Sequence, residues 1–329
     1  MSTSPAKLGY PRGWFVVARS SELAARQVLP RTFMGQPIAL FRSQGGTAYA
    51  TAAHCPHLGA HLGRCGKVVG ESLRCGFHGF RFAGDGTCVE SGYGTRPPPA
   101  ARLRTWRLTE RYGVIFLYHD PANEEPKWQI PTLDMAGWSP LVYHRFSFRG
   151  HPQEVAENTV DWGHFRHIHQ FSSFDAIGDL RFENERIIAH NQAKRALPFI
   201  NAELSTEFVV TVVGLGLSIS DVVVPSAGLR LRQLYFATPI TPERVELLAA
   251  LSVYEAPRDA WITTQLQKAL SRAAVRGMLH WIKNDIAKDI KIWEDKVYLE
   301  HPALAEGDGP IGRYRRWVRQ FYPAEVTVR

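Results

Sequence analysis

The sequence predicts an α+β protein with a small all-β domain followed by a larger domain of different architecture. In the larger domain, a curved antiparallel sheet is expected to pack on long helices. Three observations support this prediction. Short β segments separated by turn signals run from position 14 to about 118, longer β segments fill 187–241 and 244–253, and 258–300 is mostly helical.

Length and composition agree with two domains. The chain has 329 residues and a polar, proline-rich stretch at 119–131, so we expect domains at 1–122 and 123–329. The net charge of +8 comes without a basic stripe or nucleic-acid motif, which argues against nucleic acid as a partner. There is no apolar run long enough to span a membrane and no secretory h-region, so a cytoplasmic location is the default expectation.

The first domain should be built from short strands. Glycine-rich turns such as Gly45-Gly46 and Gly84-Asp85-Gly86 separate them. The expected strands are Trp14–Ala18, Pro37–Arg42, Thr47–Ala52, Phe80–Phe82 and Val114–Tyr118.

Two short motifs between these strands carry the strongest chemical signal. Cys55-Pro-His57 and Cys75-Gly-Phe-His78 offer two thiolates and two imidazoles from two loops. This set suits a Rieske [2Fe–2S] centre, in which two thiolates hold one iron and two imidazoles hold the other. A structural zinc site is the rival interpretation, but zinc fingers pair Cys with Cys and His with His, whereas each pair here is mixed.

The second domain begins with an expected strand at 142–148 and a helical stretch at 152–169. That stretch contains Asp161, His164, His167 and His169. Two histidines and a carboxylate form the facial triad of non-haem Fe(II) oxygenases. Helical spacing favours His164 with His167, because residues five apart lie roughly 140° around an ideal helix and converge only at a π-bulge or a helix end.

The third ligand should be a carboxylate from elsewhere in the chain. Asp289 lies on an apolar helical stripe, where a bare carboxylate is costly unless it is paired, protonated or bound to metal. The stripe comprises Leu279, Ile282, Ile286, Ile290, Trp293 and Val297. We expect Asp285, which is further off the stripe, to be solvated, and Trp281 and Trp293 to lie in the core.

Together these motifs resemble the Rieske non-haem iron oxygenases, terminal oxygenase component. The cluster motifs are followed by Glu157-Asn158-x-x-Asp161-x-x-His164-x4-His169, in the order typical of that family. The resemblance selects His164, His169 and Asp289 as iron ligands. It implies that Asp161 bridges by hydrogen bonds to a cluster histidine of a neighbouring subunit, and that Asn158 lies near the iron.

Within that family, the chain is most similar to the 3-ketosteroid 9α-hydroxylases and cholesterol 7-desaturases. The segment Lys288-Asp289-Ile-Lys-Ile-Trp293 looks like their carboxylate-bearing segment. The resemblance implies a helix-grip, START-like catalytic domain and a homotrimer. Ala60 and Phe77 stand where respiratory Rieske proteins carry an inter-loop disulfide, so the cluster resembles the kind used with oxygenases.

The resemblance also implies a reaction. Electrons from NAD(P)H would arrive through a ferredoxin, a flavin reductase or both, and O2 would be used at mononuclear Fe(II) to hydroxylate or desaturate an apolar, sterol-like substrate. An aromatic or natural-product substrate is one alternative. A Rieske electron-transfer protein without oxygenase activity is an alternative of another class.

Overall fold

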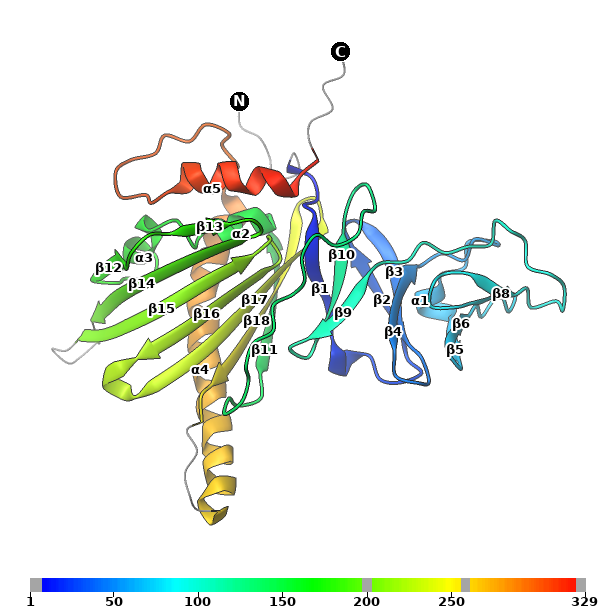
Figure 1. Cartoon of the computed structure of the whole chain (residues 1–329), viewed down its shortest axis with the longest axis horizontal. Helices are drawn as coiled ribbons and strands as arrows, with labels where there is room; N and C mark the ends of the chain where they lie inside the picture. Colours follow the sequence, from blue (N-terminus) through cyan, green and yellow to red (C-terminus); the bar gives the residue numbers. More distant parts are fainter. Residues whose placement is uncertain (1–7, 197–202, 256–260, 324–329) are drawn as a thin grey trace. The chain divides into compact units, whose positions relative to one another are not determined.

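The structure is a computed structural model and describes residues 8–196, 203–255 and 261–323. The chain divides into two compact units (Figure 1). The smaller unit comprises residues 12–127 together with 238–241, and the larger unit comprises the rest of the described chain. Each unit has its own hydrophobic core.

The smaller unit consists of three antiparallel sheets (Figure 1). A short helix, α1 (Leu62–Cys65), follows the first cluster motif. The sheets have the orders β1-β10-β9, β2-β3-β4 and β5-β6-β7-β8. The strands are β1 (Gly13–Arg19), β2 (Val28–Phe33), β3 (Gln36–Arg42), β4 (Ala48–Ala52), β5 (Lys67–Val69), β6 (Ser72–Arg74), β7 (Arg81–Phe82), β8 (Cys88–Glu90), β9 (Leu108–Arg111) and β10 (Val114–His119).

The five strands expected from the sequence correspond to β1, β3, β4, β7 and β10. Every residue of β10 is buried, which explains why it reads as a continuous apolar run rather than an alternating one. The remaining strands are short or only partly buried, so their sequences carry little periodic signal.

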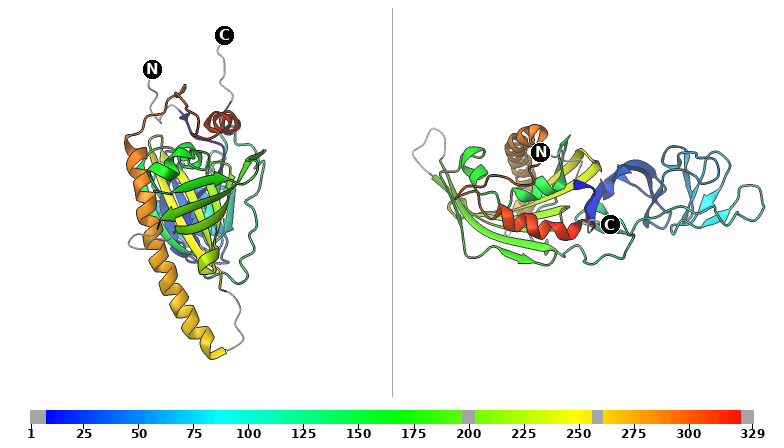
Figure 2. Two further views of the ribbon diagram at one scale, coloured as in Figure 1. Left: turned by 90° about the vertical axis from the view of Figure 1, so that its left-hand side faces the viewer. Right: turned by 90° about the horizontal axis from the view of Figure 1, so that it is seen from above.

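The larger unit is organised around one antiparallel sheet, which is strongly curved (Figure 2). Its order is β11-β18-β17-β16-β15-β14-β12, and β13 pairs with β14. The strands are β11 (Val142–Arg149), β12 (Ser173–Ala176), β13 (Arg181–Glu183), β14 (Arg186–Ala196), β15 (Glu203–Val213), β16 (Leu217–Val224), β17 (Leu229–Thr241) and β18 (Arg244–Val253). The α+β class expected from the sequence is confirmed.

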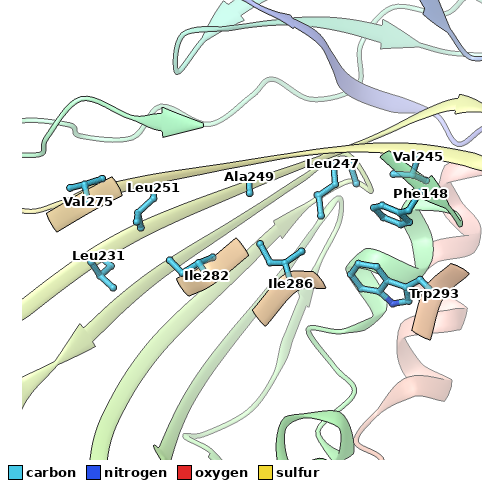
Figure 3. Close-up of a cluster of buried hydrophobic side chains, with 11 residues drawn as sticks. Phe148, Leu231, Val245, Leu247, Ala249, Leu251, Val275, Ile282, Ile286 and Trp293 are labelled. Carbon is cyan, nitrogen blue, oxygen red and sulfur yellow. The ribbon is translucent and has the colours of Figure 1, made fainter. Parts of the chain in front are cut away.

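A long helix, α4 (Trp261–Asp295), lies along one face of this sheet (Figures 1 and 2). Its predicted apolar stripe supplies Ile282, Ile286 and Trp293 to the core, where they meet side chains of the sheet such as Leu231 and Leu247 (Figure 3). The ring of Trp293 stacks on Phe148 of β11, with ring centroids 5.4 Å apart. Helix α5 (Ile311–Val318) packs through Tyr314 and its neighbours in a separate core cluster.

The single helix expected at 152–169 is wrong in its continuity. The segment forms α2 (Pro152–Glu157) and the short α3 (Gly163–His167), with a turn between them. At this break, the Trp162 amide donates to the Asp308 carbonyl at 3.2 Å. Gly309 is in the left-handed region at φ 82°, and a Cβ there would lie 2.2 Å from the Val160 carbonyl oxygen. A distant loop therefore takes over hydrogen bonding that a continuous helix would have made internally.

Candidate functional site

The break between α2 and α3 brings two histidines to one carboxylate of α4. Donor atoms of His164, His169 and Asp289 all lie within 4.8 Å of one another. Within the described parts of the chain, this is the only group of three or more His, Cys, Asp or Glu side chains that meets this distance. Two imidazoles and one carboxylate fit the ligand set of a mononuclear non-haem iron.

His169 reaches this position because α3 ends before it. The helix ends at His167, whose side chain is exposed, and Gln170 has a left-handed φ of 58°. His169 is therefore released from helical geometry and is buried next to His164, with ring centroids 5.1 Å apart. The helical spacing argument against His169 fails because α3 ends before that residue, while His167, one turn from His164, is exposed.

A hydrogen bond orients the imidazole of His164. Nδ1 of His164 contacts the Asp161 carbonyl oxygen, which can only accept, so Nδ1 carries the proton and Nε2 is free to act as a ligand. Burial lowers the pKa of His164, which favours the neutral form that binds metal. The Oδ1 atom of Asp161 also accepts from the His164 amide at 3.3 Å.

A second carboxylate, Asp285, lies on the other side of His169. Its Oδ2 is 3.1 Å from His169 Nδ1 in a bent contact, while Asp289 Oδ2 is 3.3 Å from His169 Nε2. Burial opposes protonation of His169, but the two carboxylates outweigh it and raise its pKa to about 9 when no metal competes. Burial would raise the pKa of Asp285, but contacts with His169 and Lys288 lower it to about 2.

The expectation that Asp285 is solvated is therefore wrong. Asp285 lies four residues before Asp289 on α4, so both carboxylates occupy the same side of the helix one turn apart. That spacing is visible in the sequence and could have identified it. Trp293 lies in the core as expected, whereas Trp281 is 55% exposed, so its expected core position is wrong.

The three residues lie at the wall of a cavity of about 520 Å³ between α4 and the sheet. This volume is in the range of sites for drug-sized molecules. The lining is mostly apolar, with Asn158 and, on β17, Gln233 and Tyr235 among its few polar groups. The Tyr235 hydroxyl donates to Gln233 Oε1 at 2.6 Å, so its proton is already engaged within the protein.

In the smaller unit, the two cluster motifs form matching loops. The amides of Cys55 and Cys75 donate to the carbonyls of Ala60 and Phe80, and the amides of Gly59 and Gly79 donate back to the cysteine carbonyls. Both glycines have left-handed φ values, 75° and 74°, which side chains with a Cβ rarely adopt.

These loops place the sulfur and nitrogen donors at different depths. Cys55 and Cys75 are buried, whereas His57 and His78 are half-buried with ring centroids 4.8 Å apart. Burial, together with the neighbouring Cys75, raises the pKa of the Cys55 thiol to about 11 when no cluster is bound. Two adjacent thiols inside and two imidazoles towards solvent fit a [2Fe–2S] cluster whose irons have different ligands.

Comparison with known proteins identifies both units. A family model of the Rieske [2Fe–2S] domain matches residues 13–106, and a model described as the 3-ketosteroid 9α-hydroxylase C-terminal domain matches residues 117–322. The chain belongs to the Rieske oxygenases. The protein is therefore an oxidoreductase with a [2Fe–2S] cluster and a mononuclear iron. It is not an electron carrier without oxygenase activity.

Relatives of this Rieske oxygenase cover almost all of its length. A cholesterol 7-desaturase of Bombyx mori is 30% identical, with 95% of this chain and 70% of the relative aligned. A probable 3-ketosteroid-9-alpha-monooxygenase, oxygenase component, of Rhodococcus rhodochrous is 28% identical, with 97% and 82% aligned. Membership of this family implies a ferredoxin or reductase partner as the source of electrons.

Solved structures share the fold of this Rieske oxygenase. Dicamba monooxygenase bound to dicamba aligns over 94% of this chain and 96% of its own, with a TM-score of 0.67 at 20% identity. NdmA of Pseudomonas putida CBB5 aligns over 93% and 88%, with a TM-score of 0.70 at 18% identity. No helix among the described residues is long and apolar enough to cross a membrane.

Proposed function

We propose that this Rieske oxygenase hydroxylates or desaturates an apolar, sterol- or steroid-like substrate. The observation that carries the proposal is the mostly apolar cavity of about 520 Å³ whose wall contains His164, His169 and Asp289. A rigid, apolar skeleton would fill such a cavity and bring its C–H bonds to these residues. The steroid-acting relatives support the same substrate class.

The three residues would hold Fe(II) through His164 Nε2, His169 Nε2 and the Asp289 carboxylate. Bound there, the iron would supply O2 activation, and the cluster held by Cys55, His57, Cys75 and His78 would supply single electrons. The protein orients both imidazoles through contacts at their Nδ1 atoms and excludes water with apolar walls, and Asn158, which lines the same cavity, would lie beside the reacting position. We place this activity in the cytoplasm, where NAD(P)H is available to a reductase.

We further propose that Asp161 connects the iron site to the cluster of a neighbouring subunit in a head-to-tail homotrimer. Asp161 contacts His164 through its backbone carbonyl and its carboxylate accepts from the His164 amide, so one Asp161 oxygen has capacity for a further donor. A histidine of a partner's cluster would be such a donor. Closed rings of this kind use heterologous interfaces.

Replacing Asp161 tests that role separately from metal binding. Asp161→Ala should retain both metal centres and lose turnover, because the backbone carbonyl that orients His164 is unchanged while the bridging carboxylate is gone. Iron content and the visible spectrum would report the metals, and stopped-flow oxidation of the reduced cluster would report transfer. Normal cluster oxidation in this variant would contradict the bridging role.

The function itself is tested by oxygen uptake and product analysis with a surrogate reductase. A panel of sterols, ketosteroids, aromatics and natural products should show coupled O2 uptake and product formation with the steroid group. Preparations should contain about three irons per subunit. Coupled turnover confined to aromatic substrates would refute the steroid assignment while leaving the oxygenase chemistry intact.

A further inference from the structure

One charged side chain in the cavity is not explained by iron binding. Arg195, near the end of β14, lines the cavity with its side chain 19% exposed. Its guanidinium lies 4.9 Å from the ring centroid of Trp281 and 5.5 Å from that of Phe171. Two aromatic rings therefore hold the guanidinium in place and remove part of its hydration.

The donors of this guanidinium are only partly used. Nη2 of Arg195 is 3.6 Å from Asp285 Oδ1, whereas Nη1 is buried and has no hydrogen-bond partner among the described residues. Buried donors without a partner are rare in native proteins and call for a specific reason. A bound group that accepts from Nη1 would be such a reason.

The charge of Arg195 is also incompletely balanced. Asp285 forms an ion pair with it, but Asp285 also contacts Lys288 Nζ at 2.9 Å and His169 Nδ1 at 3.1 Å. One negative charge is thus shared by three donors. The region around Nη1 therefore favours an oxygen that carries a full or partial negative charge.

We propose that Arg195 is a substrate-binding residue whose Nη1 donates to an oxygen acceptor, a keto or carboxylate group, at one end of an otherwise apolar substrate. The proposal deepens the proposed function and rests on it for the rest of the substrate. Rings that cover the guanidinium would make this contact selective, because a substrate without the oxygen leaves a desolvated donor unpaired.

Helix α4 sets the distance between this contact and the iron site. Trp281, Asp285 and Asp289 lie on successive turns of the helix, and Arg195 contacts the first two. With a rise of 1.5 Å per residue, the guanidinium lies about 6–12 Å along the helix from Asp289. The oxidised carbon should therefore be separated from the substrate oxygen by about that distance.

Equilibrium dialysis of the iron-loaded enzyme tests the contact with two matched pairs of probes. One pair is a 3-ketosteroid and its 3-deoxy analogue, and the other is 2-naphthoate and naphthalene. In each pair that binds, the wild type should prefer the oxygen-bearing probe by at least about tenfold, a typical value for a hydrogen bond to a charged donor. Arg195→Gln should remove most of that preference and leave hydrocarbon affinity within about twofold.

Two controls separate binding from structural damage. Arg186→Gln changes an arginine at the start of the same strand, paired with Glu185, and should leave the preference unchanged. Arg195→Lys keeps a charge near Asp285 but loses the planar fork, so it should retain only part of the preference. Iron content and the cluster spectrum should match the wild type in all variants.

The proposal is overturned if neither oxygen-bearing probe binds the wild type more tightly than its hydrocarbon. Equal losses for both members of a pair in Arg195→Gln would also overturn it, since Arg195 would then only support Trp281. A preference seen with 2-naphthoate but absent turnover of every steroid would support the Arg195 contact and refute the steroid assignment.

Discussion

Asp285 Oδ2 contacts Nδ1 of His169, the ring nitrogen that would not bind the proposed iron. Carboxylates that contact the second nitrogen of a metal-bound histidine fix the ring and raise its basicity, and their loss weakens metal binding about 10–100-fold. Asp285→Ala should therefore weaken Fe(II) binding by about that factor while the protein stays folded. Competition with a chelator of known affinity measures this directly.

Asp295→Ala is the matched control for this prediction. Asp295 is an exposed aspartate at the end of the same helix, so removing it should leave iron affinity unchanged. Equal iron affinities of Asp285→Ala and the wild type would show that Asp289 and packing alone position His169.

For single residues, the sequence identifies the metal-binding side chains well but does not identify the residues around them. The cysteine and histidine motifs, and Asp289 on an apolar stripe, are visible because unusual residue types occur at telling positions. The choice between His167 and His169 is not visible in the sequence, because it depends on where α3 ends. A tertiary contact from Asp308 helps set the break that precedes this helix. The environment of Asp285 depends likewise on Arg195, a residue distant in the sequence.

Among the elements, α2 is tied to α5 and to the residue that follows α4 by a buried ion-pair cluster. Glu157, 5% exposed at the end of α2, accepts from Arg315 Nε at 2.8 Å and Nη2 at 3.1 Å, and Lys296 Nζ lies 3.4 Å away. Removing one partner of a buried pair costs about 3–5 kcal/mol because the other charge stays buried. Arg315→Ala should lower the free energy of unfolding by about that amount in urea titrations.

Two further variants serve as controls for this prediction. Arg316→Ala, on the exposed side of the same helix, should change stability by less than about 0.5 kcal/mol. Combining Arg315→Met with Glu157→Gln should recover part of the loss, because no unpaired charge remains. An unfolding free energy of Arg315→Ala equal to that of the wild type would show that Lys296 and water suffice for Glu157.

Element boundaries that the local sequence determines can be predicted, whereas boundaries that depend on distant contacts cannot. Helix α4 and the long strands are visible in the sequence because their periodic apolar patterns extend over many residues. The break after α2 is not visible in the sequence, because residues 158–162 are compatible with a helix and are redirected by the loop that contains Gly309. Because Asn158 and Asp161 lie in this break, it decides the position of both.

Across the whole molecule, two buried histidines should make stability fall in acid. Burial lowers the pKa of His151 in the larger unit to about 4, and burial with the charge of Arg104 lowers that of His119 in the smaller unit to about 4. Their ordinary value is 6.5, so the unfolded chain binds more protons between pH 6.5 and 4. The stability contributed by neutral imidazoles is complete above about pH 6.5 and is lost as pH falls towards 4.

Urea titrations at pH 7.5 and 5.0 measure this loss. Each histidine should contribute up to about 2 kcal/mol of the decrease. His151 caps α2 by accepting from the Gln153 amide, and His151→Asn keeps a good capping residue while removing the titration. This variant should lose less stability in acid than the wild type, and an identical decrease in both would contradict the assignment to His151.

Helix α4 carries its proposed functions in linear order, with Trp281 beside Arg195, Asp285 beside His169, and Asp289 at the proposed iron position. Each step is one helical turn, so a substitution at one turn leaves the backbone of the next in place. Descendants of such a gene can accept new substrates by changing residues around Trp281 without rebuilding the iron site. An insertion within the helix would disrupt this arrangement, because one added residue would rotate all later residues about the helix axis by about 100°.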